Sequence, residues 1–237
     1  MNDMGYDNVT TDFDTCRELL IQGAELTKEH NFPILQAVHE FPINTISFRD
    51  SFKEMGENKG KCNVNFFEDD VRFESLWNNP YRYLEHLQDF ESVCMPDFSI
   101  SMYAPFPLNL WNTYRNRVLS YWLSKNGIKV IPNAMIADEM FWGWIWEGLP
   151  KYSTLCCCTN GRAINDEEKV KFSVQFQKME SVLCPETVII FGRKIECLKP
   201  KSNIIYMDSR ITKFEKMKDF IGANINNSVS LCKVKRL

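Results

Sequence analysis

The stretch from residue 96 to residue 132 constrains the fold more than any other part of the chain. Its sequence predicts a strand at 96–103 (PDFSISMY), a helix at 107–127 that ends at a glycine, and a second strand at 128–132 (IKVIP). Two strands joined by a helix of this length form a parallel βαβ unit, because antiparallel neighbours need only a short turn. The sheet therefore contains parallel strands whose carboxyl ends lie along one common edge.

The rest of the chain continues this alternation. Further strands are predicted at 34–38, 45–48, 62–67, 153–159, 187–191 and 203–207, and helices at 16–30, 80–90, 164–183 and 212–221. Residues 228–237 alternate enough to form an edge strand. The predicted fold class is α/β, with a largely parallel sheet and crossover helices. We expect an incomplete or distorted (βα) barrel, with an open doubly wound sheet as the second choice.

The predicted domain organisation is simple. Residues 1–14 are polar and acidic, which predicts a loose N-terminal arm. Residues 15–237 contain no internal repeat and no linker rich in proline and serine. We therefore expect a single α/β domain over 15–237.

Charge and cysteine content narrow the class of protein. The formal net charge of −3 is too mild for a general nucleic-acid-binding protein. No apolar run approaches the roughly 18 residues needed to cross a bilayer. The nine cysteines are odd in number and no secretory signal precedes them, which predicts free thiols in a reducing compartment. We expect a soluble, cytoplasmic protein with no membrane contact.

Several strings of residues, taken in order, resemble one protein family. They are EDDVRFESLWNNP at 68–80, PDFS at 96–99, WNTYRNR at 111–117, GIKVIP at 127–132, and the later pair Asp138-Glu139. In this order they resemble a domain-of-unknown-function family of bacteriophages, plasmids and Gram-positive bacteria. The resemblance implies an origin in phages or other mobile elements, and it implies no activity, cofactor or site residue.

Polar residues that follow the predicted strands are the candidate site residues, because ligands bind beside the carboxyl ends of parallel strands. The candidates for ligand binding are Arg49, Asp50, Glu68, Tyr103, Asn133, Asn160, Arg193 and Asp208. The candidates for catalysis are Asp138, Glu139 and Asp69. Clustered carboxylates can hold a divalent metal or divide into a general acid and a general base. The alternative is that these residues only cap helices and shape turns.

Two further sets of residues have more than one interpretation. Arg115 and Arg117 lie in the first turns of the helix predicted at 107–127, where they either bind an anion or pair with acids elsewhere. Trp142, Trp144 and Trp146 alternate along a segment that is apolar on both faces. Core packing is the first interpretation of the three tryptophans, and the alternatives are an interface with another protein and ligand stacking.

Motifs for specific cofactors are absent from the sequence. It has neither a G-x-x-x-x-G-K-[ST] phosphate loop nor a G-x-G-x-x-G dinucleotide fingerprint. Cys156, Cys157 and Cys158 lie in one predicted strand, where Cys157 faces away from the other two, so a zinc site is not expected. A divalent metal at the strand-end carboxylates is the one cofactor that the sequence suggests.

Two functions from different classes remain open. The first is a small-ligand or phosphorylated-substrate binding protein, or an enzyme, that uses the strand-end carboxylates. The second is an accessory protein of a mobile element that binds a host or phage protein, or a nucleoprotein complex, through an aromatic surface. An inhibitor of host defence belongs to this second class. The sequence does not choose between them.

Overall fold

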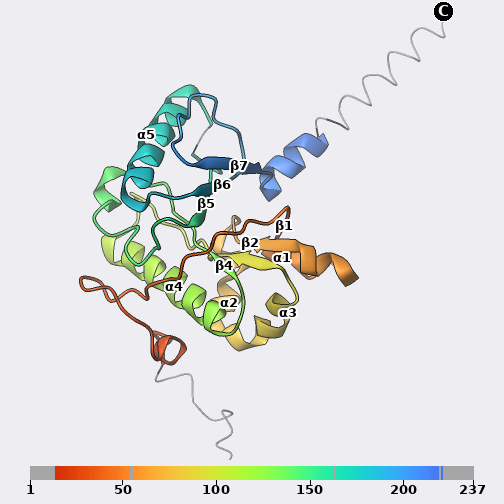
Figure 1. Ribbon diagram of the computed structural model, residues 1–237, viewed down its shortest axis with the longest axis vertical. Helices are drawn as coiled ribbons and strands as arrows, with labels where there is room; N and C mark the ends of the chain where they lie inside the picture. Colours follow the sequence, from red (N-terminus) through yellow and green to blue (C-terminus); the bar gives the residue numbers. More distant parts are fainter. Residues whose placement is uncertain (1–13, 54–55, 163, 219, 221–237) are drawn as a thin grey trace, which may run out of the picture.

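The strands form two parallel sheets in a computed structural model that describes residues 14–53, 56–162, 164–218 and 220. One sheet has the order β1-β2-β3-β4 and the other the order β5-β6-β7. Figure 1 shows the two sheets one above the other, with the helices around them. The strands are β1 (Asn44–Ser47), β2 (Cys62–Asn65), β3 (Ser92–Cys94), β4 (Val130–Ile131), β5 (Thr154–Cys158), β6 (Thr187–Phe191) and β7 (Asn203–Met207).

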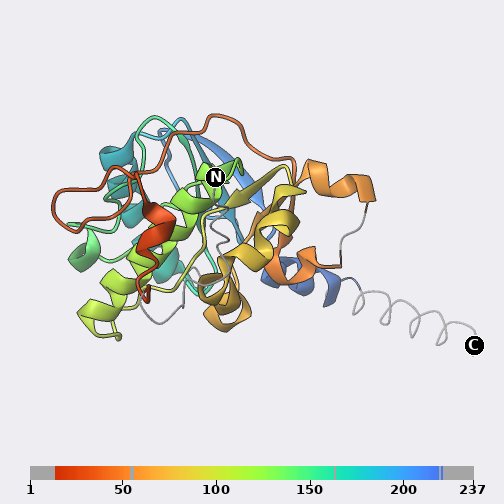
Figure 2. The same cartoon turned by 90° about the horizontal axis from the view of Figure 1, so that it is seen from below.

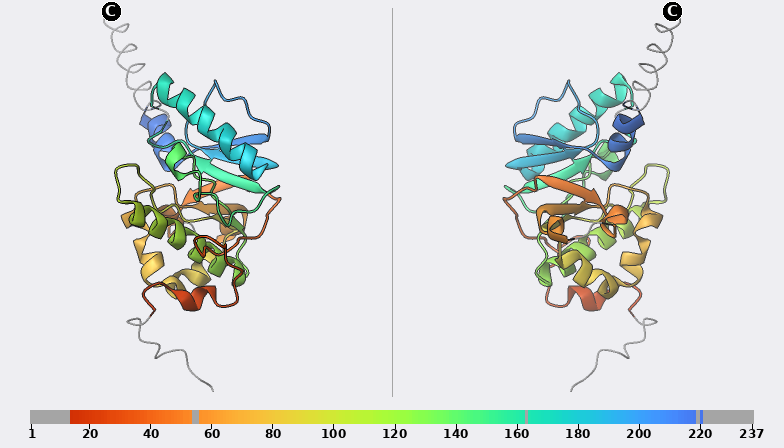
Figure 3. Two further views of the ribbon diagram at one scale, coloured as in Figure 1. Left: turned by 90° about the vertical axis from the view of Figure 1, so that its left-hand side faces the viewer. Right: turned by 90° about the vertical axis from the view of Figure 1, so that its right-hand side faces the viewer.

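Two long helices and several short ones cover these strands. The long helices are α4 (Phe106–Lys125) and α5 (Asp166–Leu183), and α5 lies beside β5, β6 and β7 in Figures 1 and 3. Residues 210–218 are also helical, as the blue helix in Figure 2 shows. The short helices are α1 (Phe48–Ser51), α2 (Glu74–Asn78), α3 (Leu84–Gln88), η2 (Glu18–Ile21), η3 (Gly56–Lys61), η4 (Asp70–Arg72), η5 (Pro80–Tyr83) and η6 (Glu139–Phe141).

The described strands do not close a barrel, and their arrangement fits an incomplete barrel or an open sheet. Every pair of neighbouring strands is parallel, and within each sheet the order follows the chain. A single parallel bridge between Asn133 and Cys156 connects β4 to β5, so the two sheets continue one another. A doubly wound sheet would instead reverse its strand order at a switch point. The predicted α/β class with a largely parallel sheet is therefore confirmed.

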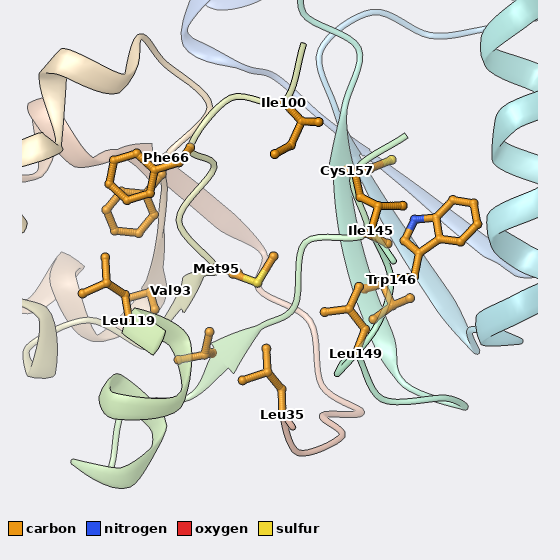
Figure 4. Close-up of a cluster of buried hydrophobic side chains, with 14 of the residues drawn as sticks. Leu35, Phe66, Val93, Met95, Ile100, Leu119, Ile145, Trp146, Leu149 and Cys157 are labelled. Carbon is orange, nitrogen blue, oxygen red and sulfur yellow. The ribbon is translucent and has the colours of Figure 1, made fainter. Parts of the chain in front are cut away.

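The core has two sides, as expected for parallel strands that are covered on both faces. A small cluster fills one side, and it consists of Phe67, Cys94, Ile131, Cys156, Ile189 and Phe191. A larger cluster joins the opposite faces of the strands to the helices; Figure 4 shows part of it around Val93, Met95 and Cys157. Cys156 and Cys157 belong to different clusters, which confirms that they face opposite sides of β5.

The second half of the chain folds much as its sequence predicts. Strands β5, β6 and β7 lie within one residue of the predicted ranges, and β6 and β7 match them fully. Helix α5 begins after Asn165, whose side chain accepts a hydrogen bond from the backbone N–H of Glu168. This cap, followed by three acidic residues in the first turn, is a strong start signal for a helix.

The first half departs from its predicted elements. The strand expected at 96–103 is irregular chain, and the true strand β3 precedes it at Ser92–Cys94. Segment 34–38 is not a strand, and of the helix expected at 16–30 the structure shows only η2. Gly23 has a φ of +84°, a left-handed conformation that does not continue a right-handed helix.

Three predictions are not tested by these residues. The loose arm at 1–14 and the edge strand at 228–237 lie almost entirely outside the described part of the chain. A single domain over 15–237 stays a prediction. No helix among the described residues is both long and apolar enough to span a membrane.

Candidate functional site

A cavity of about 640 Å³ lies at the carboxyl ends of β2, β3, β4 and β5. Its volume falls in the range of about 300–1,000 Å³ that is typical of small-molecule sites. The segments that follow these four strands all contribute to its walls, together with the first half of α5 and Ile211. The polar side chains that line it are Glu68, Asp69, Asp97, Ser99, Ser101, Tyr103, Asn133, Asp138, Asn160, Arg162, Glu168, Lys171 and Gln175.

Asp97 is the carboxyl group of this cavity whose pKa departs most from its usual value. It follows β3, and its Oδ1 accepts a hydrogen bond of 2.7 Å from Nδ2 of Asn133, which follows β4. Burial raises the pKa of the Asp97 carboxyl to about 7; the Asn133 hydrogen bond and the charge of Arg162 lower it, and the charge of Asp70 raises it. A carboxyl group with this pKa exchanges protons near neutral pH, which suits general acid–base chemistry.

Asparagine side chains of α4 hold the wall that carries Asp97. Asn116 accepts from the backbone N–H of Phe98 and donates to its carbonyl oxygen. Asn109 does the same for Ser101, and Asn112 donates to the carbonyl of Ser99. Three and four residues separate these asparagines, so they share one face of the helix. Their amides replace the ladder of hydrogen bonds that a strand would supply, which explains why 96–103 is extended but not a strand.

Asp70 fixes the same segment from the other side. Its carboxylate accepts hydrogen bonds from both the backbone N–H and the hydroxyl of Ser99, the latter at 2.8 Å. The wall after β3 is therefore held by side chains from η4 and from α4. Such support keeps a site residue in one orientation.

Arg162 is a cation of the cavity whose guanidinium is not engaged by the described residues. No hydrogen bond or ion pair engages its guanidinium among the described residues, although its charge acts on Asp97. The other lining cation, Lys171, pairs with Asp138. Arg162 belongs to the turn that follows β5, where its backbone N–H donates to the carbonyl of Thr159.

Six of the predicted strand-end residues line the cavity, so polar side chains gather at this edge. They are Glu68, Asp69, Tyr103, Asn133, Asp138 and Asn160. Burial raises the pKa of Glu68, although the Arg49 N–H that it accepts acts in the opposite direction. Asn160 has a structural role as well, since its Oδ1 accepts from the Ser209 hydroxyl. Tyr103 is 92% exposed at the rim.

The side chains of the adjacent acids Asp138 and Glu139 lie in different surroundings. Asp138 lines the cavity, where it accepts a hydrogen bond of 2.9 Å from Gln175 and pairs with Lys171. Glu139 begins η6, is exposed, and does not line the cavity. Adjacent residues in a turn point in different directions, so a shared role for the pair is not supported.

Four predicted ligand-binding residues lie outside the cavity and have other roles. Asp50 accepts hydrogen bonds from Ser47, Lys53 and Arg210. Arg49 is exposed, and it is its backbone N–H, not its side chain, that reaches Glu68. Arg193 pairs with Glu215, and Asp208 pairs with Lys216. For these four residues the structure favours the alternative that they shape turns and helix ends.

The arginines of α4 are structural. Helix α4 begins at Phe106, so neither arginine lies in its first turn. Arg115 pairs with Glu74 at 2.7 Å and stacks on Phe98. Arg117 is 1% exposed and donates to the carbonyl oxygens of Ile145 and Glu147. The anion-binding interpretation is therefore wrong for both residues.

The tryptophans mostly belong to the core. Trp144 and Trp146 are 5% and 3% exposed, and the indole of Trp146 donates to the carbonyl of Met135. Trp142 is partly exposed and stacks with Trp146. Only Trp142 is exposed enough to contribute to an interface. The turns of 139–148 place the rings of Trp144 and Trp146 inside the protein.

One group of side chains in the described residues has metal-binding spacing, and it does not line the cavity. Glu29, His30 and Glu147 each offer one ligand atom, and these atoms lie within 4.8 Å of one another. His30 Nδ1 is 2.6 Å from Glu147 Oε2, so the pair already satisfies itself. The strand-end carboxylates of the described chain do not form such a group.

Thiol chemistry is also not favoured at this edge. Cys158 lines the cavity, but burial raises the pKa of its thiol far above neutrality. Burial has the same effect on the pKa values of Cys156 and Cys157. A thiol is a good nucleophile only when it ionises readily.

Sequence reasoning missed the two residues that give the cavity its chemistry. Asp97 belongs to the string PDFS, which was assigned to a strand interior instead of a strand end. Arg162 stands one residue beyond the turn Asn160-Gly161 that closes β5. The signal for Asp97 was Pro96, because a proline rarely continues a central strand and therefore marks the end of β3.

Comparisons with known proteins agree with the family resemblance that the sequence strings indicate. A profile of the family described as "Domain of unknown function (DUF4417)" matches residues 24–209. The Gene 1 proteins of Mycobacterium phage L5 and Mycobacterium phage D29 are each 30% identical to this chain over 135 residues. That segment covers 56% of this chain, and 58% and 50% of the two relatives, so the chain spans about half of their length. No solved structure is significantly similar to the chain.

Proposed function

The chain belongs to the DUF4417 family, a phage-associated family of unknown function, and from its cavity we propose that it binds a small polar ligand and exchanges a proton with it through Asp97. The single observation that carries this proposal is the Asp97–Asn133 pair at the end of two parallel strands, with the Asp97 pKa at about 7. Asn133 orients the carboxyl group by donating to one oxygen, which leaves the other oxygen for the ligand.

The charge of the lining decides which ligand is favoured. Lys171 is occupied by Asp138, so Arg162 is left to attract anions among the described lining residues. The carboxyl groups outnumber the cations, and they are those of Glu68, Asp69, Asp97, Asp138 and Glu168. Like charges repel in a site of reduced dielectric constant. A cationic or hydrogen-bond-donating ligand is therefore favoured over a phosphorylated one.

Carbodiimide labelling tests this proposal directly. A carbodiimide adds to a protonated carboxyl group, and an amine such as glycinamide then displaces the urea to leave an amide. At pH 7 most surface carboxyl groups are ionised, whereas Asp97 is half protonated. We expect peptide mapping to find Asp97 labelled faster than the exposed Asp89, and Asn133→Ala to change the Asp97 rate.

The control for accessibility is the protein unfolded in urea, in which Asp97 and Asp89 should react alike. Labelling of Asp89 without labelling of Asp97 in the folded protein would show that the cavity does not admit a small molecule with access to a protonated carboxyl. That result would refute the proposal.

A second candidate function is binding to another protein, and one observation favours it. The loop before α4 and the first residue of α4 expose Met102, Tyr103 and Phe106, which are 49%, 92% and 51% exposed. Exposed aromatic residues are typical of interface hot spots. This set differs from the three tryptophans of the sequence prediction. Inhibition of a host defence protein is one use for such a surface.

One pair of variants separates the two functions. Phe106→Ala removes a ring that is 51% exposed and does not line the cavity, and Asp97→Asn removes the titrating group without changing the shape of the cavity. A biological effect that depends on Asp97 and tolerates the Phe106 variant supports the ligand site. The opposite pattern supports protein binding.

A cytoplasmic location is part of the proposal. It is supported by the exposed free thiols of Cys16, Cys184 and Cys197, which are more common in reducing compartments. Mass spectrometry after thiol blocking under denaturing conditions, without prior reduction, should show nine labels on the full chain. Paired losses of label would argue for an oxidising compartment.

A further inference from the structure

Asn133 keeps an unpaired hydrogen-bond acceptor at the end of β4. Its side chain is 1% exposed, lines the cavity, and donates through Nδ2 to Oδ1 of Asp97. No group in the described part of the chain donates a hydrogen bond to its Oδ1. A buried acceptor without a partner costs stability, and native proteins contain few of them. The amide of Asn133 is therefore suited to a donor that the described chain does not supply.

The backbone holds both members of the Asn133–Asp97 pair in place. Asn133 forms a parallel bridge with Cys156 of β5. Asp97 precedes Phe98, whose backbone N–H and carbonyl oxygen both bind the side chain of Asn116. The hydrogen bond of 2.7 Å between the two side chains keeps Oδ1 of Asn133 and Oδ2 of Asp97 within reach of one planar group.

The pair presents a donor and an acceptor together. Because Oδ1 of Asp97 accepts from Asn133, a proton on this carboxyl group sits on Oδ2. The pKa of about 7 means that half of the molecules carry this proton at neutral pH. The protonated pair therefore offers the O–H of Asp97 as a donor and Oδ1 of Asn133 as an acceptor.

A further part of the lining is apolar. It includes Phe67, Ile100, Met135, Ile136 and Phe141. Aromatic rings and thioethers pack well against flat aromatic groups. Small-molecule sites commonly combine walls of this kind with a few polar groups that fix the orientation of the ligand. The lining therefore favours a flat ring with a polar edge over a flexible polar chain.

We infer that the ligand is a heteroaromatic ring with an exocyclic amine beside a ring nitrogen, the edge that adenine and cytosine carry. The amine donates to Oδ1 of Asn133, and the ring nitrogen accepts the hydrogen bond from Oδ2 of Asp97. The proton can pass from Oδ2 to the ring nitrogen, which leaves a carboxylate beside a ring cation and needs no other reactant. This inference rests on the proposed function, since it uses the same carboxyl group as the proton donor.

Two other polar edges fit this pair less well. A lactam edge, an N–H beside a carbonyl as in uracil and hypoxanthine, can also bond to both side chains. Its carbonyl oxygen is too weak a base to take the proton from Asp97, however. An amidinium group carries only donors, so it leaves the Asp97 proton without an acceptor.

The test is the affinity of the full chain for matched ligands, measured by isothermal titration calorimetry at pH 7. The ligands are adenosine and its keto partner inosine, cytidine and its keto partner uridine, and benzamidine as the amidinium. We expect adenosine or cytidine to bind at least tenfold more tightly than its keto partner and than benzamidine. Analogues of that nucleoside that lack the ring nitrogen, or that carry two methyl groups on the amine, should each bind at least tenfold more weakly.

A pair of variants tests the protein side of the same contact. Asn133→Ala removes the unpaired acceptor and should weaken binding of the amino nucleoside at least tenfold. Asn203→Ala is the matched control, because Asn203 lies outside the cavity, and it should leave the affinity unchanged. If Asn133→Ala does not fold, the ligand series on the unmodified chain decides the question.

The other outcomes overturn the inference. They are equal affinity for amino and keto partners, tighter binding of a keto nucleoside or of benzamidine, unchanged affinity for the two analogues, and no binding of any ligand at millimolar concentration. Carbodiimide labelling then shows what else fails. If Asp97 is labelled faster than Asp89, the proposed proton-exchanging site stands and only its ligand is wrong. If Asp97 is not labelled, the inference and the proposed function fail together.

Discussion

The two sheets of this protein are stabilised in different ways. In the β5-β6-β7 sheet, strands of five residues and an 18-residue helix follow the pattern of the sequence. In the β1-β2-β3-β4 sheet the strands have only two to four residues. There the side chains of Asn109, Asn112 and Asn116 bind backbone groups that a longer strand would have paired.

This difference between the two sheets determines which of them carries the site residues. The regular sheet has little irregular backbone at its carboxyl edge, and it contributes mainly the turn after β5 and the start of α5 to the cavity. The irregular sheet contributes the long segments after β3 and β4, which carry Asp97 and Asn133. Binding residues are commonly found on loops that a rigid scaffold positions. In this protein the scaffold for the loop is a row of side-chain amides.

The largest expected effect tests the irregular half of the core. Trp144→Ala removes a ring that is 5% exposed and in edge contact with Phe106 and Phe141. We expect the free energy of unfolding to fall by about 3–5 kcal/mol. The matched variant Trp142→Ala, at a partly exposed ring, should cost clearly less. Urea denaturation measures both values. Equal, small losses of unfolding free energy would instead favour the interpretation that both rings belong to an interface.

The next effect is the dependence of stability on pH through Asp97. The pKa of Asp97 is raised from 3.8 to about 7 in the folded state, so the folded protein binds a proton that the unfolded chain releases above about pH 4. The stability that this proton supplies is lost as pH rises through 7. Asp97→Asn should therefore gain about 3 kcal/mol relative to the unmodified protein between pH 5 and pH 8.

The control for this pH effect is Asp89→Asn, at an exposed carboxylate beside Lys59. Its stability difference from the unmodified protein should stay constant between pH 5 and pH 8. A constant difference for Asp97→Asn as well would mean that the Asp97 pKa is not raised.

A smaller effect tests the asparagine row. Asn116→Ala leaves the buried N–H and carbonyl of Phe98 without partners, which should cost about 2 kcal/mol of unfolding free energy. Asn203→Ala is the matched control in the regular sheet, because its amide reaches only a hydroxyl at 3.5 Å. We expect that variant to change stability by less than about 0.5 kcal/mol. If the two variants were equally mild, the amides would not be what holds the wall.

The smallest effects concern the adjacent acids. Asp138→Asn removes an ion pair with a half-exposed Lys171, and should change stability by less than about 1 kcal/mol. Glu139→Gln should change neither stability nor any activity of the cavity. Loss of function in the Glu139 variant would show that the site extends beyond the cavity.

The sequence predicted the regular half well and the irregular half poorly, for a physical reason. Periodicity and caps, such as Asn165 before α5, report on backbone hydrogen bonds within elements. The segment after β3 obtains its hydrogen bonds from side chains far along the chain, and local periodicity does not record that. The rule that ligands bind at strand ends still found six lining residues. It missed Asp97 because the end of β3 was placed too late.

The central claim is that Asp97 titrates near neutral pH inside a cavity open to a small ligand. Carbon-13 NMR of protein labelled at the aspartate carboxyl carbons, with Asp97→Asn to assign the signal, measures this pKa directly. The account predicts a titration midpoint close to 7 for Asp97. A midpoint for Asp97 at the ordinary value of about 4 would contradict the account, because the carboxyl would then be permanently ionised at neutral pH.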